Sequence, residues 1–279
     1  MKKILKTAAL VAGGAVIAKG LDNRLEITRH NVRSAKIPAE FDGYKIVQIS
    51  DVHSDEVSGL VDAIRLEKPD IIVSTGDLAH HTGGYEKALS LIDTLLDIAP
   101  VYFVSGNHEA WRTDCSQMDR ALADLGAKPL HNKTITLEQS GAKIGLSGID
   151  DPFSVVSQKI RDYLDRAVTS LSPADDYNIL LFHRANWLDY FADGGFDLII
   201  SGHMHGGQMR VPGFGGVISP RSSWASGKKI LFPKYVGGRY KNDETEYIVS
   251  RGLGNPMFIP RVFNRPELVV ISLNHMEEK

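Results

Sequence analysis

Cysteine is almost absent from this sequence, which contains only Cys115 in 279 residues. A lone cysteine excludes a disulfide within the chain, and it also excludes a zinc site built on cysteine thiolates. Oxygen and imidazole groups are therefore the ligands that this chain offers to a metal ion.

A large excess of charge of either sign is also lacking, because 32 Lys and Arg residues stand against 34 Asp and Glu residues. This balance provides no general attraction to nucleic acid, so it argues against a dedicated DNA-binding protein. The sequence has no internal repeat and no low-complexity tract. Its 43% hydrophobic and 24% charged residues are typical of a globular protein that is long enough to bury a sizeable core.

The N-terminal segment falls short of the roughly 20 apolar residues that cross a bilayer. Its uncharged run covers the twelve residues 7–18 and follows a basic start. This pattern is typical of a secretory signal, with a cleavage site at Val16-Ile17-Ala18. The run reaches a spanning length only if the flanking lysines extend their charged ends out of the bilayer. A soluble amphipathic helix is the weaker alternative, because a Gly-Gly pair interrupts the segment.

We expect two parts in the chain. Residues 1–36 hold eight Lys and Arg residues against two acidic residues, and we interpret them as a signal or membrane segment with a linker. Whether the segment is cleaved or retained is left open, as is the side of the membrane, because basic residues flank the run at both ends. Residues 37–279 are expected to form one domain.

A recurring pattern lies within that domain: a short apolar, strand-like run is followed at once by polar residues that are able to bind a metal. The five instances are YKIVQIS before DVHS, DIIVST before GDLAHH, PVYFVS before GNHEAW, YNILLF before HRAN, and FDLIIS before GHMHGGQ. Helical patterns lie between them, such as the apolar residues Ala88, Leu91, Ile92, Leu95 and Leu96. Alternating strands and helices predict an α/β domain. In such domains ligand groups gather at the carboxyl ends of strands, so the five polar clusters are expected to converge on one rim.

The candidate site residues on that rim are all oxygen or imidazole donors: Asp51, His53, Asp77, Asn107, His108, His183, His203 and His205. This set suits Mn, Fe or Zn and is poor for copper(I). Four of these residues form two pairs with i, i+2 spacing: Asp51 with His53, and His203 with His205. In an extended backbone, the two side chains of such a pair point to the same side. Seven ligands are too many for one tetrahedral zinc, whereas they suit two divalent metal ions that share a carboxylate.

Any one of these histidines, taken alone, is more often a structural residue than a ligand. The conjunction changes that balance, because five of the ten histidines are among the candidate residues on the rim, together with two acids and an asparagine. The other five lack the full pattern of a strand followed at once by a ligand, and we interpret them as structural: His30, His80, His81, His131 and His275.

The motifs DVH, GD, GNHE, a lone histidine after an apolar strand, and GHMH occur in an order that resembles the calcineurin-like metallophosphoesterases. The resemblance runs from about Tyr44 to Gln208. Within the family, the chain looks similar to the membrane-associated bacterial phosphodiesterases of the YaeI/YkuE type. That finer likeness rests on the basic apolar N-terminus, on GHMHGGQ, and on YIVSRGLG followed by RPELVVISL.

The resemblance implies a four-layer α/β/β/α sandwich with a dinuclear metal site at the carboxyl ends of its strands. It assigns Asp51, His53 and His205 to the first ion and Asn107, His183 and His203 to the second. Asp77 would bridge both ions. The catalytic residue His108 would face the substrate, where it stabilises charge on the phosphoryl oxygens or protonates the leaving group.

The expected activity is hydrolysis of phosphodiester or pyrophosphate bonds by in-line attack of a hydroxide that bridges the metals. Some relatives act on UDP-2,3-diacylglucosamine, so the resemblance extends to a lipid-linked substrate. A phosphomonoesterase or nuclease on the same centre is the alternative, because the metal ligands do not select the ester. A membrane-tethered metal-binding protein without catalysis is the third hypothesis, and His108, which the metals do not need, argues against it.

Two further features stay open. Asp150 and Asp151 follow a strand-like run, so they either contact the substrate or support the site from behind, or they simply form a turn with Pro152. The tract of residues 209–240 mixes Gly, Pro, aromatic and basic residues. It is either a long surface loop or a substrate-recognition or membrane-facing lid, with its basic residues at Arg210, Lys228, Lys229 and Arg239.

Overall fold

The computed structural model of the chain describes residues 19–153, 156–173, 176–192, 194–220, 230–242, 244–256 and 259–277. The expected membrane segment 1–18 lies outside these residues, as do Lys228 and Lys229 of the expected lid. Within the described ranges, every helix is too short or too polar to cross a membrane.

The first sheet has six strands in the order β1-β14-β2-β3-β4-β5. Their bounds are β1 Glu26–Ser34, β14 Glu267–His275, β2 Lys45–Ile49, β3 Ile71–Ser74, β4 Val101–Phe103 and β5 Lys128–Pro129. The strands β2, β3 and β4 lie in three of the five expected apolar runs, and they pair in parallel.

The strand β1 lies within the residues that the sequence analysis assigned to an N-terminal segment and linker. It pairs in parallel with β14, from Glu26 opposite Glu267 to Ser34 opposite His275. The folded part of the chain therefore includes residues well before position 37. The strand was not predicted from the sequence because it is an edge strand, whose residues are mostly polar or partly exposed and form no apolar run.

The second sheet also has six strands, in the order β12-β13-β9-β8-β7-β6. Their bounds are β12 Gly238–Asn242, β13 Thr245–Val249, β9 Leu198–Gly202, β8 Asn178–Arg184, β7 Ala142–Ile149 and β6 Lys133–Gln139. The strands β8 and β9 contain the remaining two expected runs and pair in parallel.

Side-chain alternation along these strands divides the core into three parts. Between the sheets lies a cluster that contains Ile71 and Val73 of β3 with Ile179 and Leu181 of β8. The intervening residue Ile72 faces a second cluster under the helices of the first sheet, and Leu180 faces a third cluster under the helices of the second sheet.

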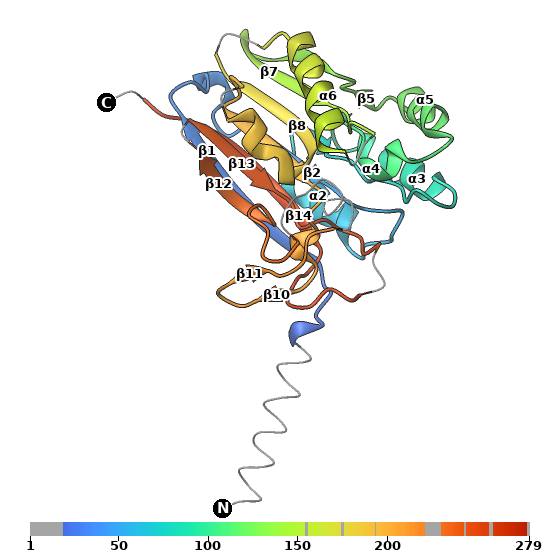
Figure 1. Cartoon of the computed structure of the whole chain (residues 1–279). Helices are drawn as coiled ribbons and strands as arrows, with labels where there is room; N and C mark the ends of the chain where they lie inside the picture. The colour runs from blue at the N-terminus through green and yellow to red at the C-terminus, as the bar shows by residue number, and fades with distance from the viewer. Residues whose placement is uncertain are drawn as a thin grey trace, which may run out of the picture.

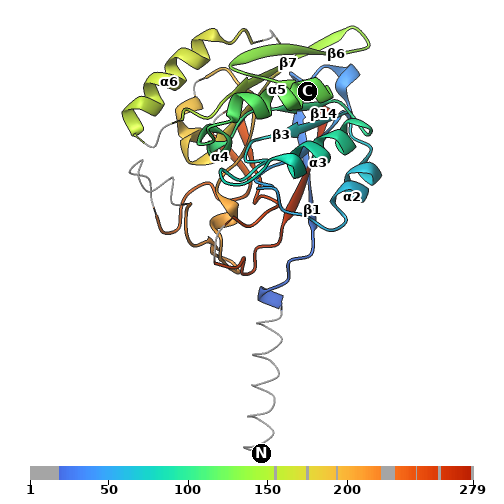
Figure 2. The ribbon, with the colours of Figure 1, turned by 90° about the vertical axis from the view of Figure 1, so that its right-hand side faces the viewer.

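Helices cover the outer face of each sheet, and Figure 2 shows α2, α3 and α5 together on one side, with α6 apart from them. The helices over the first sheet are α2 Leu60–Glu67, α3 Glu86–Leu96 and α5 Cys115–Leu125. The outer layer of the second sheet consists of α6 Ser157–Ser170 and the 3-10 helix η2 Ala185–Phe191. The expected helical pattern is confirmed in α3, whose buried residues are Ala88, Ile92 and Leu95. The architecture is the expected four-layer α/β/β/α sandwich.

The remaining short elements are η1 Ala39–Phe41, α4 Asn107–Ala110, η3 His205–Gly207, and a hairpin of β10 Arg210–Val211 and β11 Gly215–Gly216. Figure 1 shows this hairpin at the end of the molecule where the first described residues enter. The polar clusters after β2, β3 and β4 come from one sheet, and those after β8 and β9 come from the other. The rim on which they meet is therefore shared by two stacked sheets.

Candidate metal centre

All eight candidate site residues lie at or soon after the carboxyl end of a strand: His183 is still within β8, and the other seven follow a strand. Five of them have a left-handed backbone, with φ of 52° at Asp51, 53° at His53, 56° at Asp77, 73° at His203 and 48° at His205. A residue other than glycine held in such a conformation costs of the order of 1–3 kcal/mol, so these conformations indicate a site whose geometry the fold enforces. The extended backbone that we expected for the two i, i+2 pairs is wrong. Tight turns bring their side chains together instead.

A first buried group consists of Asp51, His53, Asp77 and His205, whose donor atoms all lie within 4.8 Å of one another. The two Nε2 atoms of His53 and His205 are 3.2 Å apart. Nε2 of His205 lies 3.3 Å from Oδ1 of Asp51, and Nε2 of His53 lies 3.7 Å from Oδ2 of Asp77. Four donors from three chain segments thus surround one small volume.

A second group adjoins the first through Asp77. Oδ2 of Asp77, the oxygen near His53, also lies 3.3 Å from Nε2 of His183. That Nε2 is 3.2 Å from Oδ1 of Asn107 and 3.1 Å from Nδ1 of His203. One carboxylate oxygen therefore lies between two sets of donors, a position from which one carboxylate can be shared by two ions.

The protonation of these imidazoles fits metal binding. Burial lowers the pKa of His53, His203 and His205 well below its ordinary value, so these three rings are neutral, the form that coordinates a metal. Burial alone would also lower the pKa of His183, but the adjacent carboxylate of Asp77 raises it. The negative charge that raises this pKa is the charge that a bound cation would neutralise.

His183 also has a fixed orientation, because its Nδ1 lies 2.7 Å from the backbone carbonyl of Thr75 and donates to it. The opposite nitrogen, Nε2, is thereby aimed at Asp77 and Asn107. The residues present fit two divalent ions: two carboxylates, four imidazoles and one amide oxygen, with no cysteine.

Glu109 supports the centre without facing it, and its role was missed at the sequence level although GNHE was recognised as a motif. Its buried carboxylate accepts hydrogen bonds from the backbone N–H groups of Asp77 at 2.7 Å, Gly106 at 2.8 Å and Ala79 at 3.0 Å. Burial raises its pKa to about 7. These bonds join the turn after β3 to the start of α4, and so fix Asp77 relative to Asn107.

Gly76 shows how closely these two turns approach. It has φ of +92°, and a Cβ atom at this position would lie 2.5 Å from the backbone N of Gly106. No other residue fits there without moving a loop that carries a candidate ligand.

The C-terminal part of the chain holds the loop of His205, a contribution that sequence motifs did not indicate. Nδ2 of Asn264 donates to the carbonyl oxygens of His205 at 2.7 Å and Gln208 at 3.0 Å. Arg261 is buried, and its Nη2 lies 3.4 Å from Nδ1 of His205. Neither residue follows a strand-then-ligand pattern, so only the folded contact reveals it.

Asp150 and Asp151, which the sequence left open, both take part in structural contacts. Asp151 accepts two hydrogen bonds from the buried Arg184, from Nε at 2.5 Å and from Nη2 at 2.7 Å. Asp150 accepts from the backbone of Ser105 at 2.9 Å and contacts Nδ1 of His131 at 2.7 Å. The buried ion pair of Asp151 with Arg184, the residue after His183 in the chain, thus supports the site.

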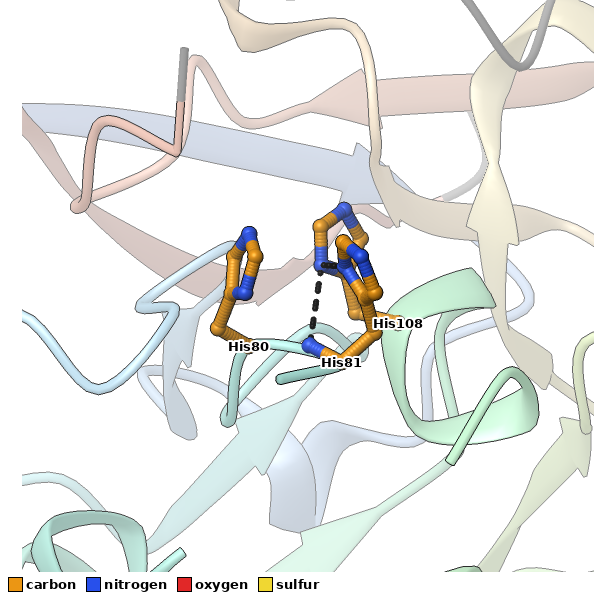
Figure 3. A group of neighbouring side chains, drawn as sticks. All are labelled: His80, His81 and His108. Carbon is orange, nitrogen blue, oxygen red and sulfur yellow. Dashed lines mark hydrogen bonds between the residues drawn. The ribbon is translucent and has the colours of Figure 1, made fainter. Parts of the chain in front are cut away.

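His108 lies at the edge of the buried groups, with its ring centroid 4.4 Å from that of His53. Its backbone N–H donates to Oδ1 of Asp77 at 2.8 Å. Figure 3 shows His80 and His81 beside it, although the sequence gave no reason to place them there. The backbone N–H of His81 donates to Nδ1 of His108 at 3.3 Å.

The chain is also similar to several known proteins. A family model described as calcineurin-like phosphoesterase matches residues 44–207. The metallophosphoesterase YkuE of Bacillus subtilis is 31% identical over 281 residues, covering 96% of this chain and 93% of YkuE. The phosphodiesterase YaeI of Escherichia coli is 25% identical over 261 residues, covering 89% of this chain and 88% of YaeI. The solved structure of a phosphopantetheinyl hydrolase from Mycobacterium tuberculosis shares the fold, with a TM-score of 0.52 at 11% identity, and the match covers 77% of this chain and 91% of the hydrolase.

Proposed function

Because this chain belongs to the calcineurin-like phosphoesterase family, we propose that it is a metal-dependent hydrolase of phosphodiester or pyrophosphate bonds. The observation that carries the proposal is the position of Oδ2 of Asp77, 3.7 Å from Nε2 of His53 and 3.3 Å from Nε2 of His183. The two buried groups of donors are thereby joined into one centre, the arrangement that supports phosphoryl transfer.

In this proposal the first ion is held by Asp51, His53 and His205, and the second by Asn107, His183 and His203, with Asp77 shared. When bound, two divalent ions supply Lewis acidity to phosphoryl oxygens and lower the pKa of a water that attacks phosphorus. The two carboxylates of Asp51 and Asp77 leave such a centre with a net positive charge, which favours an anionic phosphate ester.

His108 supplies a hydrogen bond rather than a transferred proton. Burial lowers its pKa to about 4, so the ring is neutral near pH 7. Its Nδ1 accepts the backbone N–H of His81 at 3.3 Å, and the single ring proton of the neutral form therefore resides on Nε2. A neutral imidazole N–H stabilises charge on a phosphoryl oxygen, whereas it is too weak an acid to protonate a leaving group.

Membrane attachment through residues 1–18 is part of the proposal, and it is supported by the basic start and the uncharged run of residues 7–18. A chain held at a membrane meets substrates in or on the bilayer, so a lipid-linked diester or pyrophosphate is the substrate class we propose. YaeI, which is named a phosphodiesterase, supports the choice of diester over monoester.

The test uses the full chain in mild detergent, stripped with EDTA and then supplied with Mn²⁺ or Zn²⁺. Hydrolysis of bis(p-nitrophenyl) phosphate is compared with that of p-nitrophenyl phosphate. We expect diester turnover that depends on the added metal and exceeds monoester turnover. A dominant monoester rate would replace the diesterase by a phosphomonoesterase. Binding of metal without hydrolysis of either ester, or of a lipid-linked pyrophosphate, would contradict a catalytic role.

A further inference from the structure

We propose that His80, His81 and His108 form a further metal site, separate from the buried centre, for ions that prefer imidazole such as Zn²⁺, Ni²⁺ or Cu²⁺. One ring nitrogen of each residue lies within 4.8 Å of the others. Figure 3 shows the three rings gathered at one place, two from the loop after β3 and one from α4.

The distances within this exposed histidine group suit a shared ion. Nδ1 of His81 and Nδ1 of His108 are 3.1 Å apart. Two nitrogens bound to one tetrahedral zinc at about 2.0–2.1 Å lie about 3.4 Å from each other, so this pair is close to the required separation. The three pairs of ring centroids lie 4.3, 4.7 and 4.8 Å apart. The ring of His80 is therefore the third ligand of the site, and a change of its side-chain rotamer would bring its nitrogen to the ion.

Each histidine has a nitrogen to offer. Nδ1 of His80 is 2.9 Å from Oγ1 of Thr82, which leaves its Nε2 as the donor. On His108, the ion would displace the hydrogen bond from the backbone of His81. The loop itself is held in place by Arg112, whose Nη1 donates to the carbonyl of His80 at 2.6 Å. The group therefore has a fixed backbone and adjustable side chains.

The consequence follows from the shared use of His108, and this part rests on the proposed function. An ion in the exposed histidine group takes the side chain that would otherwise contact the phosphoryl group. Zinc in excess of the amount that fills the buried centre is therefore expected to lower diester turnover.

The test measures zinc bound per chain by equilibrium dialysis of the full-length protein, with His81→Ala as the variant and His131→Ala as a matched control at another partly exposed histidine. We expect wild type and His131→Ala to bind about one zinc ion more than His81→Ala. Equal amounts in all three proteins would overturn the proposal. Because no substrate is present, this outcome is independent of whether the chain hydrolyses any ester.

Tryptophan emission gives a second readout, since the ring of Trp111 lies 5.4 Å from that of His108 and 5.9 Å from that of His81. Cu²⁺ in the exposed histidine group should quench this emission in the wild type, and much less in His81→Ala. Quenching that is identical in both proteins would place the copper elsewhere.

A second inference rests on a different observation, the exposed apolar side chains around the β10–β11 hairpin. Val211 and Phe214 of the hairpin are 42% and 81% exposed, and the adjoining Ile230, Leu231 and Phe232 are 45%, 53% and 51% exposed. Residues 230–232 pair with the chain that follows the hairpin. Leu231 forms an antiparallel β-bridge with Ile218, and the backbone N–H of Phe232 donates to the carbonyl of Val217 at 2.9 Å. We call this surface the hairpin face.

The hairpin face lies beside the point where the described chain begins. Lys19 lines a cavity of about 520 Å³ together with Arg210, Val211 and Phe263. The backbone N–H of Phe263 donates to the carbonyl of Gly20 at 2.6 Å. The first described residue, Lys19, therefore lies next to the exposed apolar side chains of the hairpin face, and in the sequence it follows the uncharged run of residues 7–18.

The geometry points to a lipid surface as the partner of the hairpin face. A segment that enters a bilayer holds its neighbouring residues at the interface, where large apolar side chains such as Phe insert. The hairpin is also tied to the metal centre, because Nη1 of Arg210 donates to the carbonyl of Gly206 at 3.2 Å, one residue after His205.

The test uses the full chain bound to phosphatidylcholine vesicles that contain brominated lipids, which quench only tryptophans within the bilayer. Phe214→Trp is compared with Leu66→Trp, because Phe214 and Leu66 are both 81% exposed. We expect a blue shift and strong quenching for Phe214→Trp alone, relative to the wild-type emission. Equal quenching of the two variants, or failure of the full chain to bind vesicles, would overturn the inference. Turnover of a soluble diester in the same samples reports separately on the proposed function.

Discussion

The buried centre and the exposed histidine group lie side by side, yet they differ in charge, burial and support. The buried centre consists of Asp51, His53, Asp77, Asn107, His183, His203 and His205, all at most 5% exposed, and it includes two carboxylates. The exposed histidine group is made of imidazoles alone, with His80 and His108 half-buried and His81 exposed. Carboxylates and burial favour ions that stay bound, whereas partly exposed imidazoles favour an ion that exchanges with solvent.

The two groups also differ in how the backbone is held. Left-handed residues and the three bonds to Glu109 define the turns of the buried centre. Two residues of the exposed group lie on one loop, which Arg112 secures through the carbonyls of His80 and Gly83. Similar ligand types thus acquire different roles from their surroundings, and four predictions test this difference.

Replacement of Asp77 by Asn is expected to have the largest effect, because its Oδ2 lies between both sets of donors. We expect a loss of about 1,000-fold in diester turnover, similar to the removal of a main transition-state contact. Metal content measured by mass spectrometry should fall in parallel. Asp93→Asn on the exposed side of α3 is the control. Near-normal turnover of Asp77→Asn would show that the buried centre is not the catalytic site.

The support behind the buried centre should have the next largest effect. Arg184→Leu leaves Asp151 as an unpaired buried carboxylate, which should lower the free energy of unfolding by about 3 kcal/mol. Urea denaturation measures this change. The exposed pair of Arg65 and Asp62, at 59% and 81% side-chain exposure, is the matched control, and Arg65→Leu should change stability by less than about 0.5 kcal/mol. Similar losses in the two variants would show that burial does not distinguish these pairs.

Metal removal should affect the buried centre far more than the exposed group. At an ion concentration of about 100 times the dissociation constant, binding adds about 2.7 kcal/mol per site to the free energy of unfolding. Because the buried centre is expected to keep its ions whereas the exposed histidine group exchanges its ion with solvent, EDTA should lower the melting temperature of wild type and His81→Ala by similar amounts. A much smaller decrease in His81→Ala would assign the stabilising ion to the exposed histidine group.

His131 belongs to neither group and should have the smallest effect. The hydrogen bond with Asp150 raises the pKa of His131, in spite of partial burial. The ion pair of His131 with Asp150 therefore stabilises the folded protein fully at pH values below the pKa of about 6.5 that His131 has in the unfolded chain. This stabilisation is lost as the pH rises through the higher pKa of His131 in the folded protein. Because the side chain is 40% exposed, the effect should stay below about 1 kcal/mol. Urea denaturation of His131→Asn should show a larger deficit at pH 6 than at pH 9, and the reverse order would contradict this ion pair.

Sequence reasoning predicted the strands β2, β3, β4, β8 and β9, together with the polar residues after them, because apolar runs and turn residues are local patterns. It also predicted that these residues meet. Two stacked sheets were implied only by the resemblance to a known family, since a strand's apolar pattern does not specify which sheet the strand joins.

Other features required the folded chain because they join distant segments. Asn264 holds the loop of His205 over a separation of 59 residues, and the backbone of His203 donates to Asp51 over 152 residues. The side chains of His80 and His81 approach His108 only because α4 packs against the turn after β3. The edge strand β1 becomes visible only through its pairing with β14.

Residue types and short-range periodicity were enough to identify which chemical groups are present and where along the chain each one follows a strand. The tertiary structure alone decided that one oxygen of Asp77 stands between two sets of donors, and that three histidines gather at the edge of the centre. These are distances between segments far apart in the chain, and such distances are set by the packing of two sheets and by left-handed turns rather than by any local pattern.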